Sequence, residues 1–242
     1  MIPTPFKPPA LQDTTASVVE CILASHDNEV YVDGEVCFLT KDELNIRTHN
    51  TARMLKIILQ DKTEQYDISR YFWERHLHVD PLTRPRSHPK FILDAEYSAT
   101  PEEEIHHPEI WKRQLDMLRS VLVHEQLHLF VGPLNRRINP RLTSLVWKLK
   151  MISPLREIPI PKILIERVGE QRARAATDLH IVVNWLELQA NKRFMGTLSQ
   201  AQDLITSVAV YQDIYQAVIE ADVAIAEIFR QPEYRDYLLE HP

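Results

Sequence analysis

The sequence predicts an α+β fold that is predominantly helical. Apolar residues recur every three or four positions through most of the chain after residue 100, whereas short runs rich in β-branched and aromatic residues occur before it. Hydrophobic residues make up 44% and charged residues 26% of the 242 positions. This composition is typical of a globular domain that is long enough to bury a core.

The first hundred residues carry the predicted strands. Residues 1–12 hold four prolines and are expected to form an extended arm. Asp33-Gly34 separates two β-rich runs over residues 29–39, which predicts a small N-terminal β-hairpin, because both turn residues need a positive φ. The sequence then predicts a helix over 68–77, a loop over 79–90 and a strand over 91–97.

The remainder of the chain is expected to be helical. The clearest helix begins at Pro108, where no amide hydrogen is needed, and ends before Gly132-Pro133. A helix starting near Glu170 or Ala176 and reaching Lys192 is also predicted. The other expected helices cover residues 143–151, 199–215 and 217–229.

Composition excludes several classes of function. Four glycines, none close to another, leave no Gly-rich loop for a nucleotide phosphate. A net charge of -6 does not provide the basic surface that nucleic-acid binding needs. Two cysteines are too few for a disulfide framework, and we find no signal peptide or membrane-spanning run. We therefore expect a cytoplasmic protein that binds neither nucleic acid nor membrane.

The segment that carries chemistry is Val123-His124-Glu125-Gln126-Leu127-His128. His124 and His128 are four residues apart, so both imidazoles leave the same helix face, at a spacing that suits one Zn²⁺. Glu125 lies between them and is placed to act on a metal-bound water as general base. This is the His-Glu-x-x-His arrangement of zinc metallopeptidases.

A zinc site of this class needs a third protein ligand. Leu134 stands where the metzincin pattern requires a histidine, so the ligand must come from another helix. His180, Asn184 and Glu187 form a polar stripe on an otherwise apolar helix. We favour His180, with Glu187 as the alternative ligand. Whichever of these residues does not bind the metal can orient a ligand, as can Asn184. Glu170 and Glu166 are weaker candidates.

These segments resemble a group of uncharacterised bacterial zincin-like proteins. The resemblance rests on Ser87-His88-Pro89 with the 91–97 strand, on the segment from Val123 to His128, on Leu179 to Glu187, and on Val210 to Tyr215. It covers roughly residues 85–215 and implies a minimal zincin fold with His180 as third ligand. The resemblance implies no substrate. We therefore expect a single domain over 13–242, in which 85–215 form the metal-binding core and 13–80 an accessory region.

Tyr211 and Tyr215 are four residues apart, which predicts that they lie on one helix face. A phenol there could stabilise the oxyanion that forms during amide hydrolysis, although aromatic residues at this spacing more often belong to the core. The 91–97 strand is a candidate edge for pairing with an extended peptide.

The sequence thus predicts a zinc-dependent hydrolase of the zincin class that cleaves an amide bond in a peptide or protein. Its Zn²⁺ would be held by His124, His128 and His180, with Glu125 as general base. A non-peptide amide is another candidate substrate. The alternative is a non-catalytic interaction or regulatory module whose zinc site is structural or vestigial. The oligomeric state is not predicted.

Overall fold

The structure, a computed structural model, describes most of the chain after residue 100. The described residues are 101–131, 140–205 and 211–238, together with four strands and separate positions between 53 and 71. These residues are predominantly helical. The arm predicted over 1–12 lies outside the described residues.

The chain divides into two compact units. One unit contains Leu127–Pro242 and the other contains Lys7–Gln126, so the boundary falls inside a single helix. Each unit is described by itself below. The single domain predicted over 13–242 stays a prediction.

The described strands form two-stranded sheets. β1 (Glu29–Val32) pairs antiparallel with β2 (Glu35–Phe38), with Val32 opposite Glu35. Asp33-Gly34 lies outside the described residues, so the predicted hairpin turn stays a prediction. β3 (Leu77–Asp80) pairs parallel with β4 (Phe91–Asp94), the first part of the predicted 91–97 strand.

The structure differs from the sequence prediction at β3. The sequence predicted the end of a helix and the start of a loop over these four residues. Parallel pairing with β4 supplies backbone hydrogen bonds to β3 from a segment about fourteen positions along the chain, from Leu77 to Phe91. A local hydrophobic pattern does not contain that information.

α3 (Pro101–His106) precedes α4 (Pro108–Val131), which is the predicted first long helix. α4 has Pro108 in its first turn and Glu109 beside it, where a negative charge is favourable. Arg119 is buried and donates to Asp116 at 2.8 Å. Burial raises the pKa of Asp116 in spite of the Arg119 charge that lowers it.

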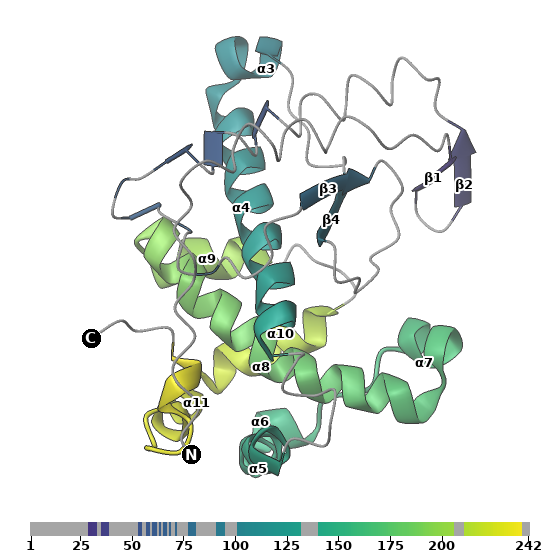
Figure 1. The fold of residues 1–242 in the computed structure, drawn as a ribbon, viewed down its shortest axis with the longest axis vertical. Helices are drawn as coiled ribbons and strands as arrows, with labels where there is room; N and C mark the ends of the chain where they lie inside the picture. The colour runs from purple at the N-terminus through teal and green to yellow at the C-terminus, as the bar shows by residue number, and fades with distance from the viewer. Residues whose placement is uncertain are drawn as a thin grey trace. The chain divides into compact units, whose positions relative to one another are not determined.

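The unit that contains Leu127–Pro242 is a set of helices arranged around one long member (Figure 1). That member is α8, Glu170–Met195, and it contacts α5, α7, α9 and α10. The remaining elements are α5 (Pro140–Leu149), α6 (Ser153–Arg156), α7 (Lys162–Val168), α9 (Leu198–Ile205), α10 (Gln212–Glu220), α11 (Asp222–Phe229) and η5 (Arg235–Tyr237).

The central part of α8 is buried on all sides, because every residue from 181 to 188 is buried. Two glycines with positive φ bound this helix. Gly169 joins α7 to α8 at φ 79°, and Gly196 ends α8 in the left-handed conformation at φ 74°. Side chains other than glycine rarely adopt such angles, so these two positions fix where α8 begins and ends.

The helices after α8 differ from the sequence prediction. A helix over 199–215 and another over 217–229 were expected, but α10 begins at Gln212 and ends at Glu220. Tyr211 is therefore the N-cap residue that precedes α10, and Tyr215 lies within the helix. Ala221 separates α10 from α11.

A tertiary contact accounts for the position of this break. Asp222, the first residue of α11, accepts hydrogen bonds from Trp185 and Gln189 at 2.9 Å each and from Lys192 at 2.5 Å. All three donors belong to α8. The carboxylate also lies at the N-terminus of α11, where the helix dipole favours it.

We predict that Asp222→Ala lowers the free energy of unfolding by about 2 kcal/mol, because it leaves partly buried donors on α8 without their acceptor. For a chain of this size the melting temperature should fall by about 6 °C in a thermal denaturation experiment. Asp222→Asn is the control, since it keeps an acceptor for Trp185 and should cost less than half as much. Equal losses for both variants would contradict the account.

Candidate metal centre

α4 presents the two histidines of the His-Glu-x-x-His motif from consecutive turns. The helix runs without interruption from Pro108 to Val131, so His124 and His128 share one face. Leu122, Val123 and Leu127 around them are fully buried, while both histidines are partly exposed. The buried apolar residues therefore fix which face of α4 points inward, and the imidazoles remain on its accessible side.

The structure brings His180 of α8 to these two histidines. The nitrogen atoms that His124, His128 and His180 can offer to a metal all lie within 4.8 Å of one another. The rings of His128 and His180 meet edge to face, with centroids 4.7 Å apart. A group of three histidines that could hold a metal ion is thus present, with His180 buried and the other two partly exposed.

Two contacts orient the imidazole of His180. Its Nδ1 lies 2.7 Å from the carbonyl oxygen of Ala176, one turn earlier on α8. A carbonyl can only accept, so Nδ1 carries the proton and Nε2 bears the lone pair. The ring of Tyr211 stacks on the same imidazole at a centroid distance of 4.0 Å and an interplanar angle of 24°. Metal-binding histidines commonly donate the N–H of the ring nitrogen that does not bind the metal, as Nδ1 of His180 does to the Ala176 carbonyl.

His180 belongs to a longer row of buried polar residues on α8. Steps of three and four residues connect Thr177, His180, Asn184, Glu187 and Asn191, and all five are at most 6% exposed. We call this row the polar seam. The sequence predicted its middle three members and missed Thr177 and Asn191, although the continued three-and-four spacing could have indicated both.

Glu187, the alternative third ligand, is engaged elsewhere. It is not a member of the histidine group, and its Oε2 accepts a hydrogen bond of 2.7 Å from the hydroxyl of Tyr215. Both side chains are buried. This contact also commits the Tyr215 hydroxyl, which sequence reasoning considered for an oxyanion.

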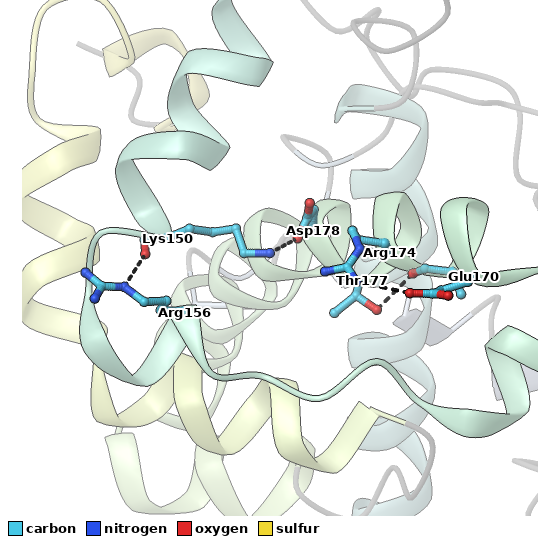
Figure 2. Close-up of polar contacts among 7 residues, drawn as sticks. Lys150, Arg156, Glu170, Arg174, Thr177 and Asp178 are labelled. Carbon is cyan, nitrogen blue, oxygen red and sulfur yellow. Dashed lines mark hydrogen bonds and ion pairs between the residues drawn. The ribbon is translucent and has the colours of Figure 1, made fainter.

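Polar contacts fix the first half of α8 (Figure 2). Lys150 reaches across to Asp178 at 2.6 Å, and the hydroxyl of Thr177 donates to the carbonyl of Ala173 at 2.9 Å. Glu170 pairs with Arg174 at 3.3 Å on the exposed side of the helix. Glu170 and the exposed Glu166 are therefore not part of the histidine group.

Glu125 follows His124 on α4 and is partly exposed. On a helix with 3.6 residues per turn, position 125 is rotated by about 100° from His124 and by about 60° from His128. The Gly132-Pro133 stop that follows α4 lies outside the described residues.

Comparison with protein-family models, curated proteins and solved structures finds no match for the chain. None of the helices in the described part combines the length and hydropathy that a membrane span requires.

The donor set fits a zinc ion. Three neutral imidazoles bind Zn²⁺ well, and the hydrogen bond from His180 Nδ1 to a carbonyl presets the tautomer in which Nε2 can bind. Within the described residues the group has three members, whereas structural zinc sites generally have four protein ligands.

We predict that His124→Ala and His180→Ala each abolish zinc binding, because two imidazoles hold Zn²⁺ far more weakly than three. Elemental analysis of the purified protein should give about one zinc per parent chain and almost none for either variant. His106→Ala, which changes an exposed histidine at the end of α3, is the control. Retention of zinc by the His180 variant would refute its role as a ligand.

Proposed function

We propose that the chain is a zinc-dependent hydrolase of the zincin class that cleaves an amide bond in a peptide or protein. The observation that carries the proposal is the meeting of His180 with the two histidines of a His-Glu-x-x-His helix. The motif and the third histidine come from helices far apart in the sequence. Their convergence is difficult to explain if His124 and His128 are ordinary surface histidines.

In this proposal each residue has one task. His124, His128 and His180 hold the ion, and the Ala176 carbonyl and the Tyr211 ring keep His180 in its binding orientation. A bound Zn²⁺ would polarise the substrate carbonyl and lower the pKa of a coordinated water towards neutrality. The Glu125 carboxylate accepts the proton of the attacking water and returns it to the leaving amine.

A non-catalytic module with a structural or vestigial zinc site is the second candidate. The burial of the polar seam favours this candidate, because a structural ion also stabilises a fold by binding buried polar groups. Glu125 favours the enzyme, because a structural site needs no base.

We predict that Glu125→Gln retains one zinc per chain and loses at least about 10²-fold in turnover, because the amide cannot accept a proton. The assay is hydrolysis of a mixed set of fluorogenic peptides by the zinc-loaded chain. Glu109→Gln, at an exposed position in the first turn of the same helix, is the control and should hydrolyse as the parent does.

A Glu125→Gln variant that cleaves at the parental rate would contradict the catalytic assignment. A zinc-loaded parent chain that cleaves neither peptides nor small amides would favour the non-catalytic module instead.

A further inference from the structure

Glu187 is a buried residue to which the proposed mechanism gives no task. It lies on α8 at 2% exposure, and its Oε2 accepts a hydrogen bond of 2.7 Å from the hydroxyl of Tyr215. Burial of a polar group costs free energy unless hydrogen bonds compensate it. A buried polar pair that meets this condition can specify one arrangement of the two elements that it joins.

The Tyr215–Glu187 hydrogen bond joins α10 to α8. Tyr215 lies in the first turn of α10, and its side chain is buried together with those of Ile214 and Val218. Apolar burial alone is non-directional, so it holds two helices together without fixing their rotation. A hydrogen bond prefers a narrow range of distance and angle. The pair therefore fixes the rotation of α10 at the level of Glu187.

The residue that precedes α10 contacts the metal centre. Tyr211 is the N-cap of α10, and its ring stacks on the imidazole of His180 at a centroid distance of 4.0 Å. His180 lies seven residues before Glu187 on α8, which is about two turns of helix. The start of α10 is thus joined to α8 at two points, the ring stack at His180 and the hydrogen bond at Glu187. A rotation of α10 at the second point displaces the ring at the first.

We propose that the Tyr215–Glu187 pair positions the third zinc ligand, because it seats the Tyr211 ring on the imidazole. The stack holds this imidazole in one orientation before an ion binds, so metal binding does not have to order the side chain. A metal-bound imidazole also gains positive charge, which the electron-rich face of a phenol ring attracts. The buried pair therefore raises the zinc affinity of the centre without contacting the ion.

This inference rests on the metal centre of the proposed function, and its test measures zinc affinity rather than activity. Competition between the full chain and a chromophoric zinc chelator gives the dissociation constant. We expect Tyr211→Leu to weaken zinc binding about tenfold, which is typical for the loss of a contact that orients a ligand. Tyr211→Phe keeps an aromatic ring for the stack and should bind zinc within about twofold of the parent chain.

The variants of the buried pair test the indirect effect. Tyr215→Phe removes only the hydroxyl and should weaken zinc binding about fivefold, in line with the loss of one hydrogen bond. Glu187→Gln keeps an acceptor for that hydroxyl and should stay close to the parental affinity. A double variant with Tyr211→Leu and Tyr215→Phe should bind zinc as Tyr211→Leu alone does, because the hydroxyl acts through the ring. Independent effects would multiply to about fiftyfold.

Asp222→Ala is the matched control for a general loss of stability. It breaks the contacts of α11 with α8 and leaves the Tyr211 stack in place, so it should lower the melting temperature without changing zinc affinity. Tyr211→Met keeps a long apolar side chain without a ring, and it replaces Tyr211→Leu if that variant does not fold. The Co²⁺ absorption spectrum of each variant reports whether the ligand geometry changes together with the affinity.

Unchanged zinc affinity in Tyr215→Phe would overturn the inference. A loss in the double variant that equals the product of the two single losses would also overturn it, as would equal weakening by Asp222→Ala. A parent chain that binds no zinc would instead refute the metal centre of the proposed function.

Discussion

The meeting of three imidazoles constrains two helices at once. Their nitrogen atoms must come within 4.8 Å, and each helix must hold its own geometry to allow this. α4 meets the requirement by running unbroken past both histidines, while fully buried apolar residues such as Val123 and Leu127 fix its rotation. α8 meets it from inside a packed unit, where His180 has almost no exposed surface. A buried polar group without a hydrogen-bond partner or a bound ion costs free energy, and an ion bound to His180 would remove that cost.

The rest of the helical unit holds α8 in place. Asp222 ties α11 to α8 through three donors, and Lys150 ties the end of α5 to Asp178, two residues before His180. Tyr215 connects α10 to Glu187. The same helix therefore both anchors the unit and supplies the third imidazole. Contacts within the unit therefore hold His180 in place without a bound ion.

Much of this arrangement could be predicted from the sequence because it is local. The start of α4 follows from Pro108, the presence of α8 follows from apolar periodicity, and the spacing of His124 and His128 follows from helix geometry. The choice of His180 rested on a polar stripe. The break at Ala221, the start of α10 after Tyr211, and β3 depend on contacts between distant segments. Neither these three features nor the Tyr215–Glu187 contact can be recognised from the pattern of neighbouring residues in the sequence.

X-ray absorption at the zinc edge of the metal-loaded chain tests the central claim most directly. The account predicts a first shell of nitrogen and oxygen atoms at about 2.0–2.1 Å, with outer-shell scattering from three imidazole rings. Substitution of His180 should remove the ion and with it this pattern. A sulfur atom at about 2.3 Å would contradict the account, because it would place Cys21 or Cys37 on the metal.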